Sequence, residues 1–219
     1  MMEDGTVFIY YTCFPTPLPA ARFAQLLARL PSALQKKVSA FRRWEDAHAS
    51  LFGKLLLQRA YDDQGIACDL HHLRYSAFGR PYLENGMDFN ISHSGTLVVC
   101  AVSATGKIGI DIELNAPLNH EDFRSQFGAQ EWEGIVSAPE PLPVFYKYWT
   151  MKEAILKADG SGLNASLAAL NVIDPAGIFY DGCQWHIQAI TGFENYICHA
   201  ASQEAGQHYE LKEIRFMDI

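Results

Sequence analysis

The sequence has few cysteines, no long hydrophobic run and a shortage of positive charge. Its five cysteines lie far apart and form no Cys-x-x-Cys pair, so neither a disulfide framework nor a cysteine-based zinc site is expected. No apolar run approaches the roughly 20 residues that a membrane-spanning helix needs. The N-terminus does not show the pattern of a signal peptide. We therefore expect a cytoplasmic protein without a membrane segment.

The charge balance argues against a nucleic-acid partner. The 219 residues include 17 basic and 25 acidic ones, which gives a net charge of −8. Such a chain has no global attraction for a phosphate backbone, so binding of DNA or RNA is not expected. The exception is a basic cluster of Lys36, Lys37, Arg42 and Arg43. It is either a solvated helix face or an anchor for a phosphate or an acidic partner.

The hydrophobic pattern predicts both helices and strands. We expect helices over 22–30, 32–63, 120–137 and 142–158, and strands over 7–12, 87–92, 96–103, 107–113, 169–173, 178–181, 185–190, 196–202 and 209–216. Turn residues between the three middle strands indicate a meander.

The order of these elements suggests an internal duplication. FNISHSGTLVVCAVSA in the first half has a weak echo in FENYICHAASQ of the second, and chance explains the echo equally well. A duplication predicts an α+β protein of two similar lobes, residues 1–106 and 107–219, related by pseudo-twofold symmetry. The cleft between them is then the expected active site, because clefts between domains are common ligand sites.

GIDIE (109–113) places two acids on one strand face. Side chains two residues apart in a strand point the same way, so Asp111 and Glu113 lie together while Ile110 and Ile112 face the core. Adjacent carboxylates repel unless a cation lies between them, and Mg²⁺ prefers oxygen ligands. A solvated polar face is the alternative, and the pair alone favours it.

WTMKEAILKADGSG (149–162) predicts a helix with Glu153 and Lys157 one turn apart. On a surface helix they form an ordinary ion pair worth a few tenths of a kcal/mol. The apolar residues around them instead indicate a largely buried helix, where charges are costly unless they are used. A third acid and a lysine suit a metal–pyrophosphate site. Gly160 ends the helix, and no Walker loop follows.

Two further segments carry candidate ligands for an anion. Ser92 and His93 in NISHSG face opposite sides of a strand, so they are a poor nucleophile–base pair, and we expect the histidine to bond a phosphate oxygen. Arg80 is held in a rigid loop by Pro81 and is a good anion donor.

Taken together these segments resemble the 4'-phosphopantetheinyl transferase superfamily, in its two-lobed Sfp-type branch. The matching motifs are GRPYL (79–83), FNISHSG (89–95), GIDIE (109–113), WTMKEAILKADGSGL (149–163) and EDAHASLFGKLLL (45–57). The resemblance spans about residues 37 to 163, and it implies the two-lobed fold of that family. Each motif alone is weak, but their order and spacing are specific.

The resemblance implies a metal site and a general base. Asp111, Glu113 and Glu153 would coordinate Mg²⁺, with Mn²⁺ as a substitute, on the pyrophosphate of coenzyme A. Glu153 would also be the general base, directly or through a water on the ion. Lys157 and His93 would bind phosphate oxygens.

The resemblance also assigns residues to the rest of the ligand. Arg80 and Pro81 would lie against the nucleotide end, Ser92 near the phosphates, and Lys37 at the phosphate ends. Glu131 matches an acidic position found in many members, without a defined role.

One position departs from the family pattern. Many members carry a basic residue directly after Asp-Ala-His, but here Ala49 follows Asp46-Ala47-His48. Ser50, Lys54 or the basic cluster would have to compensate for the 3'-phosphate of the ligand. We therefore expect weaker discrimination between coenzyme A and its dephosphorylated form.

The implied reaction moves the 4'-phosphopantetheine arm of coenzyme A to a serine of an acyl or peptidyl carrier protein and releases 3',5'-ADP. We expect a monomer whose docking patch includes Lys147 and Lys152, or the basic cluster. Two alternatives stay open: another metal-dependent phosphodiesterase such as a nuclease, and a non-catalytic module that binds coenzyme A or a carrier protein.

Overall fold

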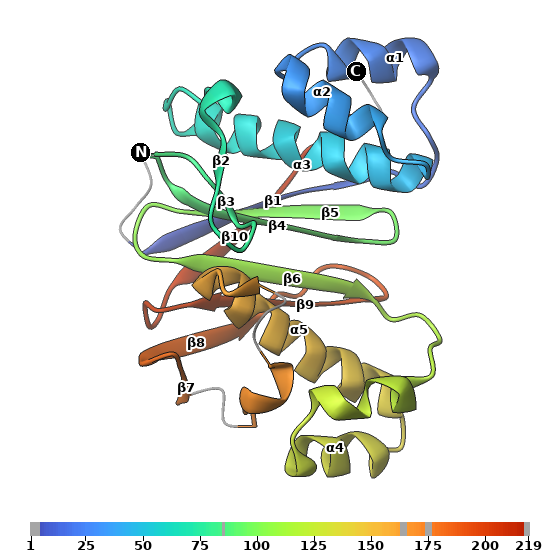
Figure 1. The fold of residues 1–219 in the computed structure, drawn as a ribbon, viewed down its shortest axis with the longest axis vertical. Coiled ribbons are helices and arrows are strands. Elements are labelled where there is room, and N and C mark those ends of the chain that lie inside the picture. Colours follow the sequence, from blue (N-terminus) through green and yellow to red (C-terminus); the bar gives the residue numbers. More distant parts are fainter. Residues whose placement is uncertain (1–4, 85, 163–165, 174–176, 217–219) are drawn as a thin grey trace.

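The structure is a computed structural model that describes residues 5–84, 86–162, 166–173 and 177–216. It is an α+β fold (Figure 1). The first half contains β1 (Thr6–Cys13), α1 (Ala20–Leu27), α2 (Ser32–Ser39), α3 (Trp44–Asp63), η1 (Leu70–His72), β2 (Arg74–Tyr75), β3 (Pro81–Tyr82), β4 (Asp88–Ser94) and β5 (Leu97–Ser103). The second half contains β6 (Ile108–Leu114), η2 (His120–Gln126), α4 (Ala129–Val136), α5 (Pro141–Asp159), η4 (Leu167–Ala169), β7 (Ile178–Tyr180), β8 (Cys183–Ala189), β9 (Tyr196–Ser202) and β10 (His208–Glu213).

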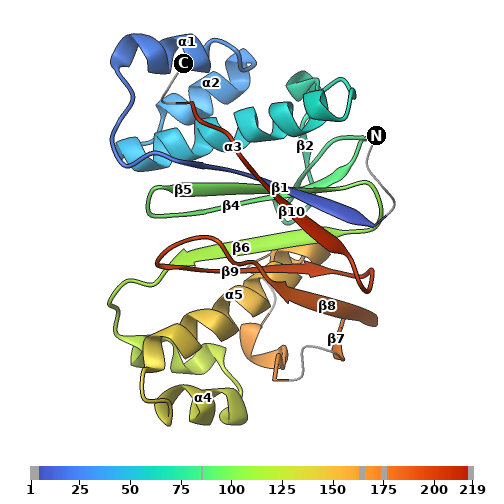
Figure 2. The ribbon, with the colours of Figure 1, turned by 180° about the vertical axis from the view of Figure 1, so that it is seen from behind.

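Two four-stranded sheets form the centre of the molecule. Their strand orders are β10-β1-β5-β4 and β6-β9-β8-β7, and β2 pairs with β3 separately. β10 runs parallel to β1, which is clear from behind in Figure 2, and the other described pairs are antiparallel. The expected boundary after residue 106 falls in the turn between β5 and β6. The C-terminal strand β10, however, returns to the sheet of the first half. The division into two domains stays a prediction.

The layers follow from which face of each strand is apolar. α3 covers the outer face of the first sheet and α5 covers the outer face of the second (Figure 1). The inner faces pack on each other through residues such as Ile9, Val99, Ile110 and Ile112. Each such isoleucine contributes about 1.5–3 kcal/mol through burial. The predicted orientation of GIDIE is therefore confirmed, and Asp111 faces α5 because its two isoleucine neighbours face the core.

The predicted meander is wrong at its third strand. β6 pairs through its backbone with β9, not with β5. It lies beside β4 instead, joined by side-chain acceptors on alternate β4 residues. The backbone N–H groups of Ile108, Ile110, Ile112 and Leu114 donate to the side chains of Asp88, Asn90, Ser92 and Ser94 at 2.8, 3.1, 3.4 and 3.1 Å. Four polar residues at period two thus replace a backbone ladder and hold the two sheets together at one edge.

The helices differ from expectation at two breaks. The helix expected over 120–137 is divided into η2 and α4, because Phe127 and Gly128 between them have extended backbone conformations. The single helix expected over 32–63 is divided into α2 and α3, because Arg43 has an extended backbone conformation at the start of α3. The break lets Leu34 and Val38 of α2 pack into the core beside α3. Residues 169–173 are described by the structure and do not form the expected strand. The short helix η4 ends at Ala169 instead. α5 ends as predicted, with Gly160 in the left-handed conformation at φ 89°.

Within the described ranges, no helix has the length and apolar character needed to cross a membrane.

Candidate active site

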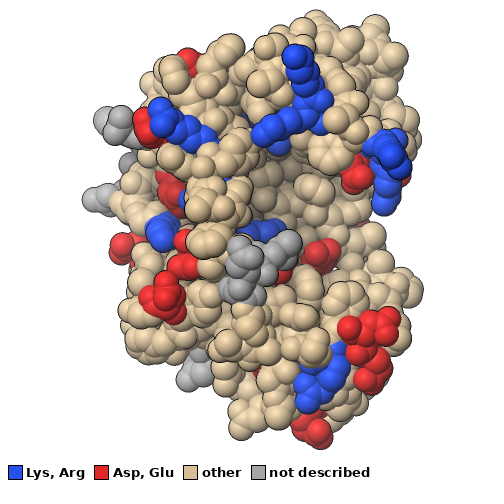
Figure 3. Space-filling model, viewed as in Figure 1, with Lys and Arg blue, Asp and Glu red and all other residues tan. Residues whose placement is uncertain are grey.

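The predicted acids and bases meet in one pocket of about 300 Å³. It lies where β4, β6 and α5 come together, and its lining consists of Ile91, Ser92, His93, Asp111, Glu113, Trp149, Glu153 and Lys157. On the face shown in Figure 3 the molecule is hollowed between its upper and lower halves, and both acidic and basic side chains lie along the hollow.

Gly109 brings the strand and the helix close enough to share this pocket. A Cβ atom at Gly109 would overlap the backbone of Ala154 and Ala158 on α5. Only glycine therefore allows α5 to lie directly on β6. Asp111 follows two residues later on the same strand face, so its carboxylate points toward the helix that carries Glu153.

Asp111 lies at the centre of the pocket and is 2% exposed. Its Oδ1 accepts from Lys157 Nζ at 2.5 Å and from Ser92 Oγ at 2.9 Å. Its Oδ2 is buried, and no described residue donates a hydrogen bond to it. An unpaired buried carboxylate oxygen is costly, so this atom is a ready ligand for a cation.

The other two carboxylates are half-buried. Burial raises the pKa of Glu153, and the negative charge of Asp111 raises it further. Burial also raises the pKa of Glu113; a hydrogen bond from Ser94 Oγ at 2.7 Å opposes that rise, and Asp111 adds to it. Both pKa shifts thus come first from burial, and the neighbouring Asp111 carboxylate adds to each.

Lys157 is the cation among these acids. Burial alone would lower the pKa of Lys157, but the carboxylates of Asp111 and Glu153 raise it above its usual value. Lys157 therefore stays charged, and its Nζ also donates to Ser92 Oγ at 2.9 Å.

The residues of the pocket fit a hard divalent ion, although the ion itself is not shown. Across the part of the chain that the structure describes, no group of three or more His, Cys, Asp or Glu side chains already has the arrangement of a metal site. One oxygen of Asp111 is bound by the Lys157 ammonium. The three carboxylates of the pocket, with the unpaired Asp111 Oδ2 among their oxygens, are nevertheless the donors that Mg²⁺ prefers.

Arg80 is largely engaged within the fold. Its guanidinium binds both oxygens of Asp88, at 2.9 and 2.7 Å, and also donates to the carbonyl oxygens of Lys157 and Ile108. It thus ties β4, β6 and the end of α5 together. Arg80 and Pro81 line a neighbouring cavity of about 220 Å³ with residues of α5 and β4. Their contact with a nucleotide stays a prediction.

A third cavity lies between α2 and α3. It measures about 410 Å³ and is lined by Leu34, Lys37, Ala40, Phe41, Ser50 and Lys54. Burial lowers the pKa of Lys54, and the nearby Lys37 lowers it further. Lys54 donates to Ser50 Oγ at 3.2 Å, and Lys37 lies over the ring of Tyr75. Ala49 is 2% exposed and packs into the core instead.

Glu131 lies in a separate buried network rather than in the pocket. Its Oε2 is 2.6 Å from Lys152 Nζ, and both side chains are 1% exposed. The same carboxylate accepts from the backbone of Val172 and Gly128. Glu131 therefore holds α4, α5 and the segment around Val172 together. The prediction that Lys152 belongs to a docking surface is wrong, because its hydrophobic stem and charge are both buried.

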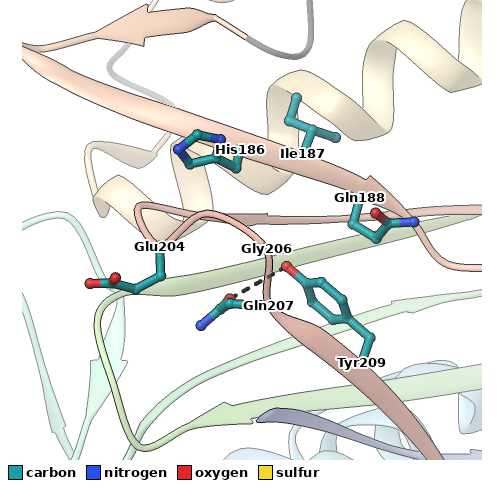
Figure 4. Close-up of a pocket in the computed structure, with 7 residues that line it drawn as sticks. All are labelled: His186, Ile187, Gln188, Glu204, Gly206, Gln207 and Tyr209. Atoms are coloured by element: carbon teal, nitrogen blue, oxygen red, sulfur yellow. Dashed lines mark hydrogen bonds between the residues drawn. The ribbon is translucent and has the colours of Figure 1, made fainter. Parts of the chain in front are cut away.

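Two more cavities lie between β8 and β10, on another part of the molecule. Their volumes are about 320 and 360 Å³, and they share Gln188, Gln207 and Tyr209. Figure 4 shows the first, where Tyr209 donates to Gln207 across 3.5 Å. None of the predicted site residues lines either cavity, so their chemistry is separate from that of the carboxylate pocket.

Sequence reasoning missed the support that β4 gives to the pocket. Ser94 holds Glu113, and Asp88 and Asn90 bond the β6 backbone. The signal was present, since polar residues occupy every second position from Asp88 to Ser94. Leu163, the last residue of the predicted helix motif, lies outside the described residues.

Comparisons with known proteins agree with the geometry. Residues 107–201 match the family model for the 4'-phosphopantetheinyl transferase superfamily, and residues 16–105 match that for the N-terminal part of a 4'-phosphopantetheinyl transferase.

Curated relatives match across most of the chain. A 4'-phosphopantetheinyl transferase of Bacillus subtilis is 32% identical over 174 residues, which is 75% of each chain. The 4'-phosphopantetheinyl transferase Sfp of Bacillus subtilis (strain 168) is 31% identical over 170 residues, again 75% of each chain. HetI of a Nostoc species is 35% identical over 150 residues, 63% of this chain and 62% of that one. The chain therefore belongs to the 4'-phosphopantetheinyl transferase superfamily, and it is an enzyme of that family.

Proposed function

We propose that this enzyme moves the 4'-phosphopantetheine arm of coenzyme A to a serine hydroxyl of an acyl or peptidyl carrier protein and releases 3',5'-ADP. The observation that carries the proposal is the pocket shared by Asp111, Glu113, Glu153 and Lys157. A pyrophosphate needs cations for its oxygens, and the incoming hydroxyl needs a base. This pocket offers acids to hold a metal ion, a lysine for phosphate and a carboxylate of raised pKa.

Asp111, Glu113 and Glu153 would hold Mg²⁺, or Mn²⁺ in its place. When bound, the ion supplies positive charge that stabilises the pyrophosphate oxygens. Lys157 neutralises further phosphate oxygens. His93 is exposed at the wall of the same pocket, and we assign it to a phosphate oxygen as well. Ser92 positions Asp111 and Lys157 through its hydroxyl.

The reaction is a displacement at the β-phosphorus of coenzyme A. The serine oxygen of the carrier forms a bond to that phosphorus as the bond to the bridging oxygen breaks, and 3',5'-ADP leaves with the electron pair. Glu153 accepts the serine proton. Its raised pKa makes it a stronger base than an exposed glutamate.

We assign the cavity between α2 and α3 to the 3'-phosphate. Burial and the neighbouring Lys37 both disfavour the charged form of Lys54. An anion placed between Lys54 and Lys37 would therefore stabilise the charge of both lysines. Ser50 adds a hydroxyl. These groups would take the place of the basic residue that Ala49 does not provide.

We further propose that the enzyme works as a monomer in the cytoplasm. The pocket is completed by elements of a single chain, β4, β6 and α5, so a second copy is not needed to build it.

Mass spectrometry of an apo carrier protein tests the function. After incubation with the enzyme, coenzyme A and Mg²⁺, the carrier should gain the mass of one phosphopantetheine arm on its serine. A carrier whose serine is replaced by alanine is the matched control and should stay unchanged. If apo carriers of fatty-acid, polyketide and peptide pathways all keep their mass while coenzyme A binds, the chain is a binding module and the proposal is wrong.

A further inference from the structure

Lys157 already has two hydrogen-bond partners in the pocket. Its Nζ lies 2.5 Å from Asp111 Oδ1 and 2.9 Å from Ser92 Oγ. Ser92 donates to the same Asp111 oxygen at 2.9 Å. The three groups form a closed triangle, so Asp111 Oδ1 already has two donors and only Oδ2 is unpaired.

A metal ion bound at Asp111 Oδ2 would therefore share one carboxylate with the Lys157 ammonium. Asp111 is 2% exposed, so little water would screen two cations held on its two oxygens. Two cations on one buried carboxylate also repel each other strongly, because the local dielectric is low. Glu113 and Glu153 line the same pocket, so three carboxylates there face the single Lys157 ammonium.

The lysine has the freedom to leave Asp111 while its helix stays in place. Arg80 Nε donates to the carbonyl oxygen of Lys157 at 2.8 Å, which fixes the backbone at the end of α5. The Lys157 side chain is 29% exposed and has a flexible four-carbon stem. Any phosphate that enters the pocket gives this ammonium a second anionic partner.

We propose that Lys157 couples the binding of the metal ion to the binding of coenzyme A. It pairs with Asp111 in the free enzyme and transfers to the phosphate oxygens when the pyrophosphate enters, which removes its repulsion on an ion at Asp111 Oδ2. This inference rests on the proposed function, because it requires both ligands to share the pocket. It has two consequences: the ion binds weakly alone, and each ligand strengthens the other by the same factor.

Isothermal titration calorimetry with Mn²⁺ measures this coupling without any turnover. Mn²⁺ is titrated into the enzyme with and without coenzyme A, after a blank titration into coenzyme A alone. When coenzyme A is absent, Mn²⁺ should bind to the Lys157→Gln variant at least about fivefold more tightly than to the wild-type enzyme. A change of this size is within the usual range of coupling between sites. With coenzyme A present the variant should show no such gain. The factor by which coenzyme A strengthens Mn²⁺ binding should thus fall by about fivefold or more.

Lys147→Gln is the matched control, since it removes one exposed lysine from the same helix outside the pocket. It should keep the wild-type coupling. If Lys157→Gln changes Mn²⁺ affinity equally with and without coenzyme A, the lysine is only a fixed neighbouring charge and the inference is wrong.

Two further results keep the test decisive. Lys157→Met serves if the glutamine variant does not fold, and it should behave in the same way. Wild-type enzyme that binds both ligands without mutual strengthening overturns the coupling alone. Wild-type enzyme that binds neither Mn²⁺ nor coenzyme A overturns the proposed function together with it.

Discussion

At the scale of single residues, the account rests most heavily on Glu153. Replacing it with Gln keeps the shape of the side chain but removes the base, so turnover should fall about 10²- to 10⁴-fold, the usual share of general base catalysis. The rate of carrier modification is the measurement, and circular dichroism should show an unchanged fold. Glu133→Gln, at an exposed position on α4, is the control and should keep the wild-type rate. A Glu153→Gln enzyme of wild-type speed would remove Glu153 from the mechanism.

Lys54 gives a second prediction at this scale. Lys54→Met should raise the KM for coenzyme A about tenfold or more, because a charge-assisted bond to phosphate contributes roughly 1.5–3 kcal/mol. The KM for dephosphorylated coenzyme A should not change. Lys36→Met is the control, since Lys36 is an exposed lysine next to Lys37 in the basic cluster but does not line the cavity. Equal effects on both ligands would place the 3'-phosphate elsewhere.

The place of a residue in the site could be predicted where a local sequence pattern determines it. Asp111 and Glu113 share a strand face because of their spacing, and the structure places them in one pocket with Glu153 and Lys157. The engagement of Arg80 by Asp88 could not be predicted, because an arginine in a loop gives no sign of which carboxylate will reach it.

At the scale of elements, the contact between β4 and β6 depends on side chains that take the place of a backbone ladder. Asn90→Ala should lower the free energy of unfolding by about 1–3 kcal/mol, since it leaves the buried N–H of Ile110 unpaired. Urea denaturation is the measurement. Gln188→Ala, at an exposed amide on β8, should change stability by less than about 0.5 kcal/mol. Equal losses in the two variants would mean that the β4 side chains do not hold β6.

The contact between β9 and α5 gives a pH dependence. His199 is buried, and its Nδ1 lies 2.7 Å from Thr150 Oγ1. Burial lowers the pKa of His199 from 6.5 to about 4, and Lys147 contributes to the shift. Between these values the unfolded chain binds a proton that the folded chain does not, so stability falls as pH drops from 6.5 toward 4.

The size of that loss is on the order of 3 kcal/mol. Glu113 and Glu153 act in the opposite direction, because their raised pKa values favour the folded state as they become protonated. Comparing wild type with His199→Gln cancels the carboxylates. Urea denaturation across this pH range should show a flatter dependence for the variant. Parallel curves would mean that His199 is charged in the folded protein or has the same pKa in the folded and unfolded states.

The elements themselves were largely predictable, because hydrophobic period and helix-ending residues are local signals. α5 ends at Gly160 as the sequence indicates, and β1 covers the expected strand. The partners of strands were not predictable. β6 and β5 are adjacent in sequence, yet β6 pairs with β9, since pairing depends on which apolar faces meet in the folded chain. The break between α2 and α3 was also missed, because the helical spacing of apolar residues continues across it.

At the scale of the whole molecule, the fold closes by returning its last strand to its first. β10 pairs in parallel with β1, a contact between the two ends of the sequence that no local pattern could reveal. The two family models meet at residues 105 and 107, beside the boundary predicted between the halves. The packing of the two sheets is what brings β4 and β6 together, and α5 then completes the pocket.

The central claim is that Asp111, Glu113 and Glu153 converge on one divalent ion that also contacts the pyrophosphate of coenzyme A. The most direct measurement is the anomalous scattering of Mn²⁺ in crystals grown with coenzyme A. The account predicts a single strong peak within ligand distance of all three carboxylates and of a pyrophosphate oxygen. A peak bound to coenzyme A alone, or a ligand held away from these side chains, would contradict it.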